Sequence, residues 1–180
     1  MNYYKNSKAI AFQNAAQSGF KFRSLMFFQI PLIWFSGIKV NQFDRNSCSV
    51  KLPFTRRTQN PFRSVYFAAQ CMAAELSTGL ILMAETIETG KKCSMLVTDM
   101  RATFIKKADA TIYFTCAPNN TIINAIQHAI EKNEPVKFML LSEGKMDDGT
   151  VVASFEFEWS LKFKGKLFSS ALHHNEHRIN

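Results

Sequence analysis

The stretch Asn60–Leu82, NPFRSVYFAAQCMAAELSTGLIL, decides the fold, because it predicts one long helix whose small and apolar side chains suit burial. Asn60 is placed to cap this helix and Pro61 to occupy its first position, while Gly90 is expected to end it. A single stripe of side chains recurs at steps of three and four residues and is expected to face the core: Cys71, Met72, Glu75, Thr78, Gly79 and Leu82.

Glu75 is the only acid in this stretch. If the stripe is buried, the carboxylate either finds hydrogen-bond donors or its pKa rises, and both outcomes are typical of a catalytic acid or base. Alternatively, Glu75 lies at the edge of the stripe, where it reaches solvent or pairs with a Lys or Arg. The periodicity leaves both interpretations open.

Strands and helices are predicted on both sides of this helix. An opening helix over residues 8–17 is followed by a hairpin of residues 37–43 and 48–54 around the turn at 44–46. Further strands are predicted over 93–105, 111–116, 136–143 and 151–164, with an amphipathic helix over 120–132. The turn Asp147-Asp148-Gly149 predicts that the last two strands form a second hairpin. Runs of strands around one long helix predict an α+β domain with an antiparallel sheet wrapped about that helix.

Three parts of the chain are expected. Residues 1–34 form a helix and an apolar connector, residues 35–164 the main domain, and residues 165–180 a polar tail. The apolar run 24–38 is too short to span a membrane and contains Gln29 and Pro31, so no transmembrane segment is expected. Packing across the sheet or against a second subunit is favoured for this run over attachment to a membrane surface, for which five of its residues are candidates: Phe27, Phe28, Ile33, Trp34 and Phe35.

Composition narrows the function classes. The four cysteines have no CxxC spacing and are interpreted as buried, reduced thiols of a cytoplasmic protein, and no metal site is expected. The net charge of +8 attracts polyanions, but the basic residues are scattered apart from three doublets, which suit a few phosphates better than a nucleic acid. No nucleic-acid partner is therefore expected.

The predicted order of elements resembles the hotdog fold of thioesterases over about residues 35–164, most closely the phenylacetyl-CoA thioesterase type. In that type an Asn opens the helix, a His-Gly-Gly follows, and a carboxylate comes fifteen residues after the Asn. Asn60 and Glu75 keep this spacing, and Ser64 stands where a small residue is usual. Tyr66, Phe67 and Ala68 replace the His-Gly-Gly.

The resemblance implies hydrolysis of an acyl-CoA, with coenzyme A entering as part of the substrate and no other cofactor. Glu75 would be general base or nucleophile, and Asn60 would orient water or substrate. Backbone N–H groups near Tyr66, Phe67 and Ala68, beside Ser64, would hold the oxyanion. The resemblance further implies that Lys106 and Lys107 meet the phosphates of coenzyme A, with Arg63 as a weaker candidate, and that the site lies across a homodimer interface, within a dimer or a dimer of dimers.

Three alternatives remain. The missing His-Gly-Gly favours a non-catalytic acyl-CoA or lipid binder on the same fold. A hotdog dehydratase would need a catalytic His, and His128 on the short helix is the only histidine before the tail. A partner-binding module would leave Glu75 exposed and paired. Hydrolysis of an acyl-CoA is the favoured function.

Overall fold

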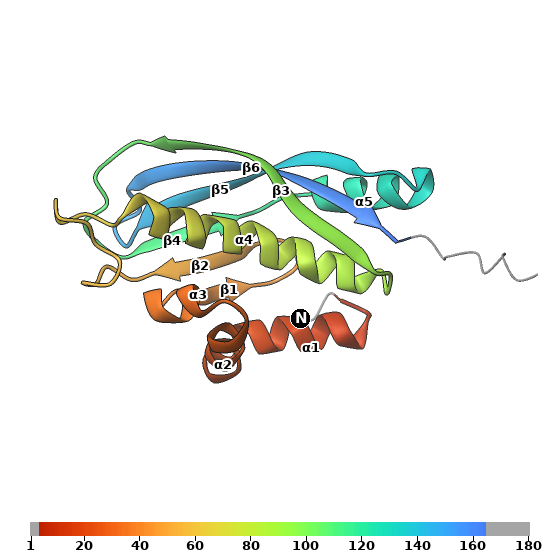
Figure 1. Ribbon diagram of the computed structural model, residues 1–180, viewed down its shortest axis with the longest axis horizontal. Coiled ribbons are helices and arrows are strands. Elements are labelled where there is room, and N and C mark those ends of the chain that lie inside the picture. The colour runs from red at the N-terminus through yellow and green to blue at the C-terminus, as the bar shows by residue number, and fades with distance from the viewer. Residues whose placement is uncertain (1–3, 165–180) are drawn as a thin grey trace, which may run out of the picture.

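The protein is seen in a computed structural model that describes residues 4–164. Its centre is helix α4 (Phe67–Glu88), which lies in the concave face of a curved six-stranded antiparallel sheet (Figure 1). The strand order is β1-β2-β4-β5-β6-β3, and the strands are β1 (Lys39–Phe43), β2 (Cys48–Leu52), β3 (Cys93–Phe104), β4 (Ile112–Cys116), β5 (Val136–Met146) and β6 (Val151–Phe163). The predicted α+β architecture is confirmed.

Short polar turns set the register of the two predicted hairpins. In the β1–β2 turn, Asp44 Oδ1 accepts hydrogen bonds from the backbone N–H groups of Asn46 and Ser47. In the β5–β6 turn, Asp148 Oδ1 accepts from Thr150 N, and Gly149 adopts the left-handed φ of 82° that favours glycine. These turns place the alternating apolar side chains of each strand on the face that packs against α4.

Small side chains let α4 sit close to the sheet. Ala73, Ala74 and Ala84 are fully buried, and Ser77 Oγ lies 2.7 Å from Ser142 Oγ of β5. By length and apolar composition, α4 is also the only helix among residues 4–164 able to cross a membrane, but 61% of its most apolar window is buried in the protein. This helix is therefore the core helix of the domain.

The predicted start of the long helix is wrong. Asn60 and Pro61 lie in a loop, and α4 begins at Phe67 with Tyr66 as its N-cap residue. The loop cannot continue the helix because Arg63 has a left-handed φ of 56°. The predicted end is correct, since α4 stops at Glu88 and Gly90 follows with a φ of 68°.

The apolar connector is helical. After α1 (Ser7–Gln17), the chain forms α2 (Gly19–Gln29) and α3 (Pro31–Ser36), with Pro31 in the first turn of α3. Buried residues of the three helices, among them Phe22 and Ile33, join the same core as the sheet. A division after residue 34 would therefore cut α3, and the expected tail, 165–180, lies outside the described residues.

The three N-terminal helices form a layer beside α4 and β1, and α5 (Thr121–Lys132) packs against β5 and β6 (Figure 1). One edge of the sheet, β1, is thus flanked by helices α1 and α2. The other edge, the twelve-residue strand β3, has no further strand beside it among the described residues. Its exposed apolar side chains include Leu96, Met100 and Phe104.

Candidate functional site

Glu75 lies in the third turn of α4, facing the N-terminal helices. Gly79 follows one turn later and lies next to both Glu75 and Trp159. A Cβ atom added to this glycine would stand 3.3 Å from Glu75 Oε1 and 3.5 Å from the ring of Trp159. Trp159 belongs to β6, and its Nε1 donates a 3.1 Å hydrogen bond to Thr78 Oγ1. Glu75 and Trp159 therefore both border Gly79, and α4 itself holds the indole in place.

An apolar cavity of about 270 Å³ adjoins the Glu75 carboxylate. Helix α4, the N-terminal helices α1 and α2, and the two strands β3 and β6 form its walls. Glu75 is its only charged lining residue, and most of the others are apolar, including Phe12, Phe22, Leu25, Met26, Met83 and Trp159. The sequence placed Glu75 on a stripe whose burial it left open, and it did not indicate that α2 builds the opposite wall.

The surroundings of Glu75 match neither interpretation fully. The side chain is half-buried, and its carboxylate has no hydrogen bond or ion pair with any residue of the range 4–164. Burial alone raises the pKa of this carboxyl group above its usual value. The rest of the stripe is also only partly buried, since Thr78 and Leu82 are buried but Cys71, Met72 and Gly79 are half-buried. The side of α4 that is fully buried in the core is the side next to this stripe.

A second cavity, of about 630 Å³, lies at the N-terminal end of α4. It brings together six of the residues predicted from the sequence: Asn60, Ser64, Tyr66, Phe67, Lys106 and Lys107. Ala68 is the second residue of α4, just beyond this lining, and Arg63 is exposed on the adjoining loop. Glu75 lines the other cavity. Within one chain, the predicted base therefore lies in a different cavity from the other predicted groups.

Asn60 organises the loop before α4. Its Oδ1 accepts hydrogen bonds from Phe62 N at 3.0 Å, Ser64 N at 3.2 Å and Ser64 Oγ at 3.2 Å. This network replaces the helix cap that the sequence predicted. The Nδ2 group of Asn60 has no acceptor within the described part of the chain. It is free to donate to a ligand in the cavity.

The first turn of α4 presents unpaired backbone donors to this region. Tyr66 makes no side-chain capping bond, and the N–H groups of Phe67 and Ala68 have no intrahelical acceptor. Such N–H groups carry partial positive charge and can hold an anion or an oxyanion. The rings of Tyr66 and Phe67 stand edge to face with centroids 4.9 Å apart, and both side chains are exposed.

Lys106 and Lys107 follow β3 on the opposite side of the same cavity. Their segment is held to the loop before α4, because Val65 N donates a 2.7 Å hydrogen bond to Ala108 O. Both ammonium groups are without an ion pair among residues 4–164. The cavity thus joins two cations to the positive end of a helix, and it has no acidic lining residue. This arrangement suits phosphate groups.

Gln70 is a member of this cavity that the sequence did not single out. Its side chain is buried, its Nε2 donates to Val65 O at 3.1 Å, and its Oε1 has no partner within the described residues. Trp159, on the wall of the Glu75 cavity, was missed too. The only signal for either residue is a large or polar side chain in an apolar run, which many core residues share.

The two cavities lie along one helix. Phe67 and Glu75 are eight residues apart, which corresponds to about 12 Å along the axis of α4. Within one chain, Asn60 and Glu75 therefore line separate cavities at different points along α4.

No metal site is formed by the described residues, since no group of three or more His, Cys, Asp or Glu side chains comes together there. The four cysteines are free. Cys48 and Cys116 are buried neighbours across β2 and β4, and burial raises the pKa of Cys116 to about 12. Cys71 and Cys93 are half-buried, whereas the sequence predicted that all four would be buried.

A known protein family matches most of the chain. The sequence matches, over residues 20–161, a family described as "Domain of unknown function (DUF4442)". None of the curated proteins matches it.

Solved structures are more informative. A protein from Pseudomonas aeruginosa described as a probable thioesterase has a TM-score of 0.70 and 20% identity, covering 79% of this chain and 93% of its own. A thioesterase from Haemophilus influenzae has a TM-score of 0.57 and 11% identity, covering 79% and 89%. The Escherichia coli PaaI protein, from the phenylacetic acid degradation operon, has a TM-score of 0.57 and 12% identity, covering 86% and 96%. The chain shares the hotdog fold with these structures, so the resemblance in fold stated from the sequence is confirmed.

Proposed function

This chain belongs to the family described as Domain of unknown function (DUF4442), and we propose that it is an acyl-CoA thioesterase. The observation that carries the proposal is the unpaired, half-buried carboxylate of Glu75 on the wall of an otherwise apolar cavity. A thioesterase needs a base or nucleophile beside an apolar acyl site. A core carboxylate with no such role would be expected to have a hydrogen-bonding partner.

In this proposal, Glu75 removes a proton from water, and the hydroxyl oxygen attacks the thioester carbonyl carbon. The C–S bond then breaks, and coenzyme A leaves as a thiolate that takes up the proton. Attack by the Glu75 carboxylate itself, followed by hydrolysis of the anhydride, is the other route open to this residue. Nδ2 of Asn60 and the N–H groups of Phe67 and Ala68 would stabilise the oxyanion.

Coenzyme A would bind at the cavity before α4. Its phosphates would meet Lys106 and Lys107, with Arg63 nearby on the exposed loop. The acyl group would occupy the Glu75 cavity. An apolar cavity of about 150 Å³ holds one benzene ring, so the 270 Å³ present here corresponds to an acyl chain of about ten carbons.

The separation of the two cavities supports a homodimer or a dimer of dimers. If two copies join through the free edge of β3, the Glu75 cavity of one subunit can face the Asn60 cavity of the other. Pairing would also cover the exposed apolar side chains on that strand. The four free thiols are consistent with a cytoplasmic protein, which we propose as its location.

The test is thiol release from acyl-CoAs of two to sixteen carbons and from phenylacetyl-CoA. We expect kcat/KM to be highest near eight to ten carbons and to fall at least 100-fold in Glu75→Gln, since loss of a general base costs about 10²–10⁴-fold. Leu25→Trp, which fills part of the cavity from α2, should shift the preference to shorter chains. Full activity in Glu75→Gln would refute the assignment.

A second candidate is a non-catalytic acyl-CoA or lipid binder. It is favoured by the paired rings of Tyr66 and Phe67, which stand where thioesterases of the phenylacetyl-CoA type have His-Gly-Gly and restrict access to the backbone donors. Saturable binding of acyl-CoA by the wild-type protein, measured by calorimetry, with no thiol release from any acyl-CoA, would support this function instead.

A further inference from the structure

Helices α2 and α3 expose a set of large apolar side chains, of which only Ile30 also lines the Glu75 cavity. We call them the α2–α3 face, and they are Phe20, Phe27, Phe28, Ile30, Leu32 and Phe35. Phe20 and Phe28 are the most exposed, at 83% and 81%. Other residues of the same helices, Phe22, Met26 and Ile33, are buried and anchor the helices to the core. The helices thus have apolar side chains on both their inner and outer sides.

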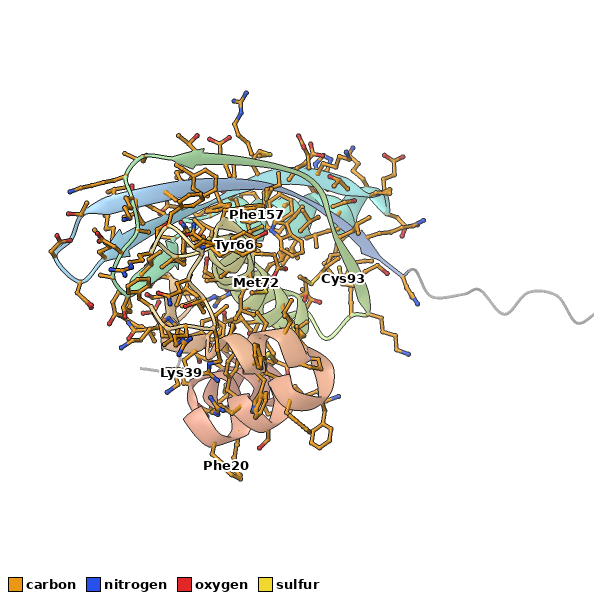
Figure 2. All side chains as sticks on the ribbon, turned by 60° about the vertical axis from the view of Figure 1, so that its left-hand side comes forward. Phe20, Lys39, Tyr66, Met72, Cys93 and Phe157 are labelled. Atoms are coloured by element: carbon orange, nitrogen blue, oxygen red, sulfur yellow. The ribbon has the colours of Figure 1, made fainter. Side chains whose placement is uncertain are left out.

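The aromatic side chains on the α2 part of this face lie close together. Phe20 and Phe27 are seven residues apart on α2 and so share a side of that helix. The ring of Phe27 contacts Phe28 and, across the turn between the helices, Trp34, with centroids 5.1 and 5.2 Å apart. Figure 2 shows Phe20 at the end of the helical layer farthest from the sheet. Phe20 therefore lies at an outer end of the molecule.

Cations border this surface. The Arg23 guanidinium lies over the Trp34 ring at 5.5 Å, and the Arg57 guanidinium lies over the Phe35 ring at 5.8 Å. Lys21 adjoins Phe20 in sequence, and Lys39 follows α3 beside the same helices (Figure 2). The first 43 residues of the chain contain no Asp or Glu. The surface is therefore both apolar and positively charged.

From this combination we propose that the α2–α3 face docks the protein on an anionic lipid surface. The exposed rings would enter the boundary between headgroups and acyl chains, and Lys21, Arg23 and Lys39 would lie among the headgroups. Helices of eleven and six residues are too short to span a bilayer, so they would lie on its surface, with Phe22 and Met26 keeping the inner side of α2 on the core. The negative potential of an anionic membrane surface attracts cations that lie close to it.

A second copy of the chain fits this surface less well than lipid does. In a symmetric dimer the same patch meets itself, so the bordering cations of the two copies would be brought together with no acidic group from residues 1–43 to compensate them. An anionic bilayer supplies both a compensating charge and an apolar phase.

The experiment is co-sedimentation of the full chain with phosphatidylcholine vesicles, with and without about a third of phosphatidylserine. We expect at least tenfold stronger binding to the anionic vesicles. The double variant Phe20→Ser/Phe28→Ser should weaken binding at least tenfold, and Lys21→Glu/Arg23→Glu should remove the dependence on phosphatidylserine. The matched control is Met139→Ser/Leu141→Ser, which removes two exposed apolar side chains of β5 and should bind like the wild type.

A second measurement needs no change in the apolar face. Trp34 lies beside Phe27, whereas Trp159, the only other tryptophan, is buried in the core. Brominated lipids should quench the fluorescence of the wild-type protein but not that of Trp34→Phe. The proposal is overturned if anionic vesicles bind no better than neutral ones, or if the Phe20/Phe28 variant binds equally well. It is also overturned if that variant breaks up an oligomer while wild-type protein ignores vesicles.

Discussion

At the scale of single residues, the position of Glu75 is costly for the fold. Its carboxylate is partly removed from water, and no donor among residues 4–164 compensates it. Asn60 shows the opposite situation, because its Oδ1 satisfies three donors and its Nδ2 is left over. Glu75 therefore reduces the stability of the fold, whereas Asn60 increases it. Substitutions at these two residues should change activity and stability in different directions.

Replacing Glu75 by Gln should make the protein more stable at neutral pH. Burial raises the carboxyl pKa in the folded state, so the folded state holds the proton to higher pH than the unfolded chain does. The destabilisation by Glu75 is therefore absent below the ordinary pKa of 4.5, grows as pH rises through the folded-state pKa, and then stays constant. Thermal unfolding should give a higher Tm for the variant at pH 7 and equal values near pH 4.

The same shift predicts the pH dependence of hydrolysis. As a general base, Glu75 must be ionised, so kcat/KM should fall on the acidic side at a pH above that of an ordinary glutamate. Steady-state kinetics across the acidic range test this. An acidic limb centred at or below the ordinary value of 4.5 would show that the half-buried carboxylate is not the base.

Asn60→Asp and Asn60→Ala should separate the two roles of this side chain. Asp keeps an acceptor for the Ser64 and Phe62 donors but loses the Nδ2 donor, so it should fold normally and lose about 10²-fold in kcat. Ala loses both and should also be destabilised by about 1 kcal/mol, as for loss of a capping side chain. Equal activity of Asn60→Asp and wild type would leave Asn60 with only its structural role.

At the scale of elements, close approach between neighbours determines how the sheet packs. Gly144 of β5 pairs with Phe114 of β4, and a Cβ atom at Gly144 would lie 2.5 Å from Cε1 of that ring.

The β1–β2 turn is held to α4 by a bidentate ion pair, in which Arg45 Nε and Nη2 lie 2.9 and 3.1 Å from the Glu85 carboxylate. Glu85 is almost fully buried.

Gly144→Ala should destabilise the protein by about 1–3 kcal/mol, because the added Cβ would overlap the fully buried Phe114 ring and force it to shift. The control is Gly19→Ala at the start of α2, where an added Cβ meets nothing within 4 Å. That variant should be neutral or slightly more stable, since Ala favours helix. In urea unfolding, Gly144→Ala should therefore have a lower midpoint concentration than Gly19→Ala. The difference in their free energies of unfolding measures the clash.

Arg45→Met should cost about 2–3 kcal/mol, because it leaves the charge of Glu85 buried without its bidentate partner. The double variant Arg45→Met/Glu85→Gln removes that charge and should recover more than half of the loss. A double-mutant cycle by chemical unfolding measures the coupling. Additive effects of the two substitutions would mean that the ion pair does not stabilise the attachment of the turn.

At the scale of the whole molecule, the arrangement of two cavities along one helix predicts complementation between inactive subunits. If each site combines Asn60 of one subunit with Glu75 of the other, a mixed dimer of Asn60→Asp and Glu75→Gln chains has one intact site. Random reassortment of equal amounts should then restore about one quarter of wild-type activity, because half of the dimers are mixed. Mixtures that stay inactive after verified exchange of subunits would place both residues in one chain.

Much of the fold is predictable from the sequence because it depends on local signals. Alternating apolar residues, the turn at Asp148 and Gly149, and the small-residue run of α4 each act over a few neighbours, and all are found as predicted. Asn60 misled the prediction of the helix start, because the same side chain that caps a helix also closes an Asx turn. The left-handed φ of Arg63, which is set by the surrounding loop, distinguishes the two cases and places Asn60 in a turn.

The sequence by itself therefore determined the α+β class, the order of the strands along the chain and the presence of Glu75 in the apolar first half of the central helix, since these follow from residue type and spacing. Only the tertiary structure decided what surrounds that acid. Helix α2 folds back to wall the Glu75 cavity, β6 brings Trp159 against it, and the loop before α4 moves Asn60 away to join Lys106 and Lys107. These contacts join residues far apart in the chain, and the packing of whole elements, which no local pattern encodes, creates them.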